Sequence, residues 1–127
     1  MKKIATSLLL LTIGFFSLTS AIPGKPVVAQ ISSDMVITLP TDQAVAEKYV
    51  VDISALNIKS AETLENFCTN FSEQNVTLNA DFNSKQIGIV IEPFTDSAGV
   101  TWDATKWNTY FASRAPKMAM YISTFNK

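Results

Sequence analysis

The order of apolar patterns between residues 49 and 91 is the feature that most constrains how this chain can fold. Residues 49–53 have the two-residue apolar period of a β-strand. An amphipathic helix of about 13 residues follows, because apolar residues recur three and four positions apart after Ser60, a good N-cap. The apolar stripe of this helix consists of Ala61, Leu64, Phe67, Cys68 and Phe71. Two alternating runs, 76–82 and 87–91, then predict a β-hairpin.

The flanking segments extend this pattern at both ends. Residues 35–39 predict a short N-terminal strand. A second helix can begin at Thr101 or Asp103 and is expected to stop at Pro116, which lacks a backbone N–H. Residues 117–125 predict a final strand on the alternation of Met118, Met120 and Ile122. The order β-α-β-β-α-β predicts an α+β, ferredoxin-like sandwich, with two helices on one face of a four-stranded antiparallel sheet and a possible extra N-terminal edge strand.

The first 21 residues have the composition of a secretory signal peptide. Two lysines precede an uncharged apolar run of about 15 residues, which is shorter than a membrane span needs, and small residues follow. Cleavage is predicted after Ala21, with Ala29 as the alternative position. The short lysine-led start is typical of bacteria. The protein is therefore expected to be periplasmic or secreted, with no stable membrane anchor after cleavage.

The remaining chain is expected to form one domain. Residues 22–33 contain two prolines and a glycine and predict a linker or an extended N-terminal segment, and residues 34–127 predict a single α+β domain. Residues 41–48 are compatible with one helical turn or with a long loop. Removal of residues 1–21 would leave 106 residues with 8 basic and 11 acidic side chains, a net charge of −3. That length is sufficient for one modest hydrophobic core without disulfides.

The absence of histidine and the single cysteine exclude several function classes. With 0 His and 1 Cys, the chain cannot form a His-based catalytic triad, a multi-Cys zinc site or a disulfide framework on its own. A net charge of −1 argues against nucleic acid as a partner. We therefore expect no enzyme activity, no catalytic residue, no cofactor and no metal ligands. Cys68 is predicted to be a small buried hydrophobe, and a reactive or intermolecular thiol remains the alternative.

From Tyr49 to Ile91 the sequence resembles the heavy-metal-associated domain family. The resemblance lies in the strand ending Val51-Asp52-Ile53-Ser54 and in the hairpin sequence VTLNADFNSKQIGIVI of residues 76–91, and it covers about 45 residues. In that family, two thiols in an M-x-C-x-x-C loop between the first strand and the first helix bind a soft metal ion. The corresponding loop here, residues 56–62, contains no cysteine. The resemblance thus implies the ferredoxin-like fold without its metal site.

An aromatic pair is the best candidate for an interaction surface. Trp102 and Tyr110 lie in and beside the second predicted helix, next to the loop formed by residues 94–100. Exposed rings there could bind a glycan or a peptide, and simple packing is the other interpretation. The sequence favours a small secreted, non-enzymatic domain for protein interaction or assembly, which pairs with an unknown protein or with itself through a sheet edge. The alternative is a periplasmic ligand- or metal-binding module derived from a heavy-metal-associated domain.

Overall fold

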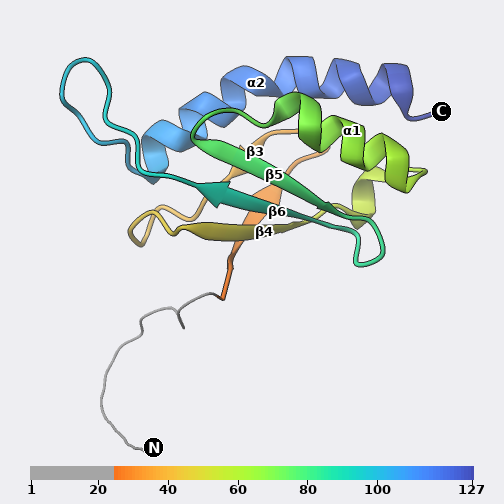
Figure 1. Ribbon diagram of the computed structural model, residues 1–127, viewed down its shortest axis with the longest axis horizontal. Helices are drawn as coiled ribbons and strands as arrows, with labels where there is room; N and C mark the ends of the chain where they lie inside the picture. Colours follow the sequence, from red (N-terminus) through yellow and green to blue (C-terminus); the bar gives the residue numbers. More distant parts are fainter. Residues whose placement is uncertain (1–24) are drawn as a thin grey trace, which may run out of the picture.

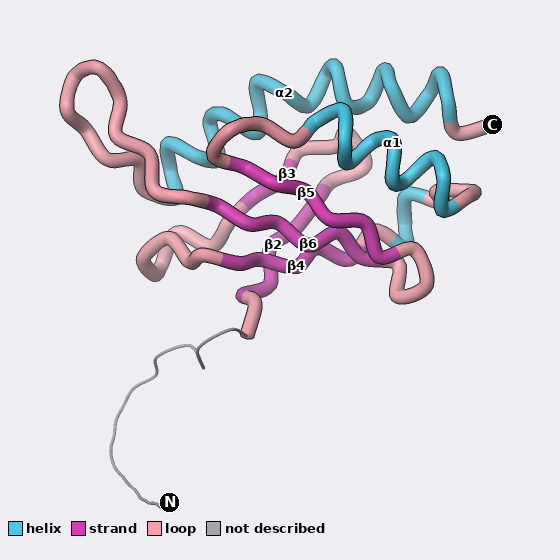
Figure 2. Tube along the Cα trace, in the orientation of Figure 1, coloured by secondary structure: helices cyan, strands magenta, loops and turns pink. Residues whose placement is uncertain are grey.

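The computed structural model describes residues 25–127, and the expected signal peptide, residues 1–21, lies outside this part. The described chain forms five strands, two α-helices and one short 3-10 helix (Figures 1 and 2). The strands are β2 (Val27–Ile31), β3 (Ile37–Thr38), β4 (Lys48–Asp52), β5 (Val76–Asp81) and β6 (Gln86–Ile91). The helices are η1 (Ser54–Leu56), α1 (Ala61–Phe71) and α2 (Ala104–Phe125).

The sheet has the order β3-β2-β4-β6-β5, and both α-helices cover the same face of it (Figure 1). The α+β class and the placement of two helices on one face are therefore confirmed. The possible extra N-terminal edge strand is present as β3, but the predicted antiparallel sheet is wrong, because β2 runs parallel to β4 and the sheet is mixed. In a ferredoxin-like sandwich the last strand would lie beside the first strand of the motif. Here β2 occupies that position next to β4.

The N-terminal part of the chain is built into the sheet. β2 lies within residues 22–33, the segment expected to be a linker or an extended segment. Residues 27–29 pair with residues 49–51 of β4, and residues 30–31 pair with β3. β3, which corresponds to the expected N-terminal strand, forms one edge of the sheet. The two N-terminal strands thus extend the sheet beyond β4.

The predicted final strand is wrong, because α2 does not end at Pro116. The helix has 22 residues in all and extends past Pro116 to Phe125. Proline removes one helical hydrogen bond, to the carbonyl of the residue four positions earlier. Pro116 and that residue, Ala112, are both exposed, so the freed carbonyl can face solvent. Met118 is buried, whereas Met120 is 69% exposed, as expected one half-turn further along a helix. The apolar residues of this segment therefore alternate in the sequence, although the backbone is helical.

The core lies between the sheet and the two helices. Ser60 caps α1 by accepting a hydrogen bond from the Thr63 N–H at 3.1 Å, and Asp103 caps α2 through the Lys106 N–H at 3.0 Å. The side chains that face each other across the two layers are almost fully buried. From the sheet they include Tyr49, Val51, Leu78, Ile87, Ile89 and Ile91, and from the helices Leu64, Phe67, Cys68, Phe71, Trp107, Phe111, Ala115 and Met118. No helix among residues 25–127 has both the length and the apolar content needed to cross a membrane.

Hydrogen bonds occupy part of the backbone at both edges of the sheet. Directly after β3, the Leu39 N–H donates to Asn108 Oδ1 at 2.7 Å, and Asn108 Nδ2 donates to the Leu39 carbonyl at 3.1 Å. At the β5 edge, the Leu78 N–H donates to Ser72 Oγ at 2.8 Å. Glu73 and Val76 exchange two backbone hydrogen bonds at the same edge. These backbone groups are therefore not available to a strand of another chain.

We predict that Met118→Ala and Met120→Ala have very different effects on stability. Met118→Ala removes a buried side chain and should lower the free energy of unfolding by about 2–5 kcal/mol. Met120→Ala, at an exposed position, should change it by less than about 0.5 kcal/mol. Urea denaturation followed by circular dichroism measures both values. Similar losses in the two variants would indicate a strand with both residues in the core and would contradict the continuous helix.

We also predict that Asn108 stabilises the β3 edge. Asn108→Ala leaves the N–H and carbonyl of Leu39 without their partner and should cost about 1–3 kcal/mol of unfolding free energy. Thr109→Ala, an exposed change at the next position of the same helix, is the matched control and should stay within about 0.5 kcal/mol of the wild type. Equal stability of the two variants would show that the amide does not hold β3.

Candidate functional site

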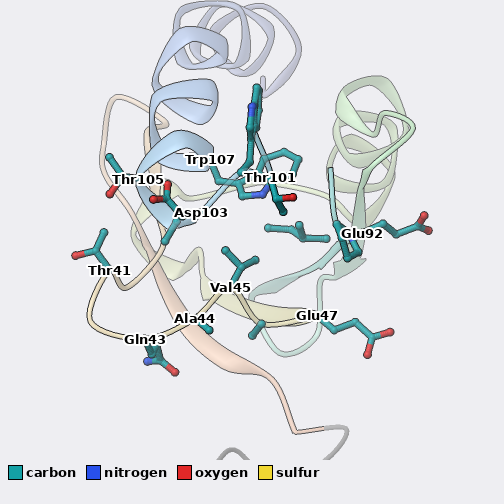
Figure 3. Close-up of a pocket in the computed structure, with 15 residues that line it drawn as sticks. Thr41, Gln43, Ala44, Val45, Glu47, Glu92, Thr101, Asp103, Thr105 and Trp107 are labelled. Atoms are coloured by element: carbon teal, nitrogen blue, oxygen red, sulfur yellow. The ribbon is translucent and has the colours of Figure 1, made fainter. Parts of the chain in front are cut away.

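A cleft of about 650 Å³ opens at one end of the sheet (Figure 3). Three segments that are far apart in the sequence line it: the loop 41–47 between β3 and β4, residues 91–93 at the end of β6, and residues 101–107 at the start of α2. Much of the lining is apolar. Clefts of this size and character are typical of binding sites for small molecules.

The loop 41–47 forms one wall of the cleft and is held at its end by β4 and β6. The Ala46 N–H donates to the hydroxyl of Tyr49 at 2.7 Å, and the Ile91 N–H donates to the Glu47 carbonyl at 2.9 Å. Tyr49 is 2% exposed, so its ring is part of the core while its hydroxyl holds the loop. Within residues 25–127, the backbone groups of residues 41–45 form no hydrogen bond to another backbone group. This wall therefore exposes unpaired N–H and C=O groups.

Trp102 belongs to the opposite side of the cleft, and its ring is fixed by its neighbours. Its backbone N–H donates to the Phe94 carbonyl at 2.9 Å, and its indole N–H donates to Asp96 Oδ2 at 3.3 Å. The ring centroid lies 4.9 Å from those of both Phe94 and Trp107, in edge-to-face geometry. Because the indole is held by backbone, carboxylate and ring contacts, it is a rigid half-buried surface.

The loop of residues 94–100 supports Trp102. Figure 1 shows this loop projecting beyond the sheet beside the start of α2. Asp96 Oδ1 accepts hydrogen bonds from the N–H groups of Ala98 and Val100, both at 3.0 Å. The hydrogen bond from Val100 is the main cause that lowers the pKa of Asp96 below its ordinary value, and burial opposes it. Asp96 thus serves the loop structure and stays ionised near neutral pH.

The two aromatic residues selected from the sequence do lie together. The ring centroids of Trp102 and Tyr110 are 6.1 Å apart, and both residues are half-buried. Both line a second hollow of about 300 Å³, and Trp102 also lines the larger cleft. The hydroxyl of Tyr110 donates to Glu73, whose carboxylate also pairs with Arg114 at 3.0 Å. Trp102 therefore separates two hollows, whereas the polar end of Tyr110 is used within the fold.

The opposite wall of the cleft, the loop 41–47, was not predicted from the sequence. Residues 41–47 have no clear helical or strand period, and their role depends on the distant hydroxyl of Tyr49. The small apolar run Ala44-Val45-Ala46 beside Pro40 was the only available signal in the sequence.

Within residues 25–127, no group of three or more His, Cys, Asp or Glu residues is placed to hold a metal ion. Cys68 is 3% exposed on the inner face of α1. No family model matches the sequence, and comparisons with curated proteins and with solved structures found no similar protein. The cleft and the ring of Trp102 are therefore the features that carry the functional argument.

We predict that Cys68 does not react in the folded protein. Burial raises the pKa of its thiol to about 12, with a further contribution from the Glu65 carboxylate. At pH 8 the disulfide reagent DTNB should therefore label it only after unfolding in urea, because the thiolate is the reactive form. Absorbance of the released product measures the rate. Rapid labelling without urea would contradict a buried thiol.

The same shift predicts a pH dependence of stability. Because the folded state favours the neutral thiol, Cys68 contributes to the free energy of unfolding at pH values below its ordinary pKa of 9.0. This contribution is lost as the pH rises towards the folded-state pKa of about 12. Other groups titrate in this range, and Cys68→Ala is the control that retains them. The wild type should lose more unfolding free energy than Cys68→Ala between these pH values.

Proposed function

We propose that this protein is a small secreted, non-enzymatic domain that binds an extended peptide segment of a partner protein in the cleft. The observation that carries the proposal is the pairing of two different walls. One is the loop 41–47, whose residues 41–45 have unpaired backbone groups, and the other is the fixed ring of Trp102. A peptide can form backbone hydrogen bonds with the first wall and place apolar side chains against the second.

The partly occupied sheet edges favour the cleft over strand addition. Addition of a partner strand needs free backbone groups along an edge. Asn108 occupies those of Leu39, and Ser72 and Glu73 occupy part of the β5 edge. Within residues 25–127, residues 41–45 of the loop form no backbone–backbone hydrogen bond, and the loop lies next to an aromatic surface. For this reason we place partner binding at the cleft.

The position of β2 supports the earlier of the two cleavage points. Cleavage after Ala29 would remove Val27, Val28 and Ala29, the residues of β2 that pair with β4. It would also remove one core side chain, since Ala29 is 2% exposed. Cleavage after Ala21 leaves the whole strand in place. We therefore propose that the secreted form begins at residue 22.

The alternative function, metal binding derived from the heavy-metal-associated family, has less support. The arrangement β4-α1-β5-β6, with β6 between the other two strands, agrees with the fold that the resemblance implies. However, residues 56–62 contain no thiol, thioether or imidazole, which are the groups that soft metals prefer. The resemblance therefore supports a fold and not a metal site. None of residues 56–62, the loop that corresponds to the family's metal-binding loop, lines the cleft.

Selection from a random peptide library tests the proposed function. We expect the protein purified from the periplasm or medium to select peptides that bind it, with affinities measured by fluorescence anisotropy. Ala44→Arg places a long side chain at the exposed wall of the cleft and should weaken binding at least tenfold. Trp102→Phe, which keeps a smaller ring, should weaken it several-fold.

Ala98→Arg is the matched control for this experiment. It adds the same side chain at an exposed position in the loop 94–100, which does not line the cleft. Its affinity should stay within about twofold of the wild type. Failure to select any specific peptide, or equal binding by the Ala44→Arg variant, would overturn the proposed function.

A further inference from the structure

The charged groups that line the cleft are all acidic. Among its fifteen lining residues are Glu47, Glu92 and Asp103, and none is Lys or Arg. Figure 3 shows Glu47 and Glu92 on one side, with their carboxylates turned away from the centre, and Asp103 on the opposite side near Thr105. The carboxylates thus lie around the entrance of an otherwise largely apolar cleft. Their negative potential acts on a ligand before and after it enters.

Two of these carboxylates have no internal partner. Glu47 and Glu92 are exposed, and within residues 25–127 the only ion pair joins Arg114 to Glu73 at the neighbouring hollow. Asp103 is partly used, since one of its oxygens accepts the Lys106 N–H. Unpaired carboxylates at the rim remain available to a cation from outside.

The basic groups closest in sequence do not line the cleft. Lys48 comes directly after Glu47 and is the first residue of β4, where it pairs with Val90 of β6. Lys48 and Val90 line a separate hollow. Lys106 follows Asp103 in α2, and its charge helps to lower the pKa of Asp96 in the loop 94–100. Neither is among the lining residues. The negative field at the entrance is therefore only partly offset.

We propose that the ligand is cationic: an extended peptide that presents a Lys or Arg side chain to this entrance. This inference rests on the proposed function and adds the chemical class of the ligand. The aliphatic stem of such a side chain can pack on Val45 and Pro93, while its head stays near the carboxylates. Trp102 offers an aromatic face that also attracts cations. An acidic peptide meets only like charges at the same place.

Four capped peptides test this inference directly. They share one library-selected sequence and carry Lys, Arg, Gln or Glu at the position under test, with both termini blocked. We expect the Lys and Arg peptides to bind about three- to tenfold more tightly than the Gln peptide, the range that two exposed ion pairs allow. The Glu peptide should bind most weakly. The preference should shrink between about 50 mM and about 500 mM salt, because exposed charges are screened.

A pair of double variants assigns the preference to the cleft. Glu47→Gln with Glu92→Gln should remove most of the difference between the Lys and Gln peptides. Glu62→Gln with Glu65→Gln makes the same change in net charge at exposed positions of α1 and should leave the difference intact. Loss of the preference in both double variants would overturn the inference, because it would then be an effect of net charge alone.

The two proposals fail in distinguishable ways. If peptides bind at the cleft, as judged by Ala44→Arg, but Lys, Gln and Glu are bound equally, the cationic ligand is wrong and the peptide-binding function stands. If the library yields no specific peptide, both are wrong. Tighter binding of an uncharged oligosaccharide than of any peptide would likewise overturn both and would assign the cleft to glycans.

Discussion

Packing of one 22-residue helix across the sheet connects parts of the chain that are far apart in the sequence. In its first half, α2 buries Trp107 against the core and uses Asn108 to pair with the backbone after β3. Near its end, Tyr121 packs edge-on against the rings of Phe67 and Phe71 of α1. Asn126 then accepts the Lys59 N–H at 2.8 Å, just before α1 begins. A helix that stopped at Pro116 would lose the last two connections.

The same helix explains why a cleft exists at all. The chain leaves β3 next to Asn108 and reaches β4 where the Tyr49 hydroxyl holds Ala46. Both ends of the intervening loop are therefore fixed at places set by the core. Between these points the loop runs past the start of α2 without packing closely on it, and the 650 Å³ cleft is the space that remains. The positions of the two ends of the loop, and with them the walls of the cleft, are therefore set by the core.

Local patterns in the sequence predicted the elements whose packing follows directly from their period. The stripe that includes Leu64 and Phe67 correctly identified α1, and the hairpin of β5 and β6 followed from alternation. The final strand failed because Met118 and Ile122 satisfy a two-residue and a four-residue period equally well. Pro116 then favoured the wrong choice, and only its exposed position in the fold shows why the helix tolerates it. The parallel pairing of β2 depends on a partner about twenty residues away and leaves no local sign.

The candidate site shows the same division between local and distant information. Trp102 could be selected from the sequence because a large ring beside a loop is unusual in itself, but the wall opposite it could not. That wall depends on the Tyr49 hydroxyl, on the backbone of Ile91 and on Asn108, which lie in three different elements. The contacts that satisfy the backbone at the sheet edges leave residues 41–45 as a stretch of free backbone beside an aromatic ring. Within residues 25–127, the proposed peptide-binding cleft thus combines a stretch of unpaired backbone with a large aromatic surface.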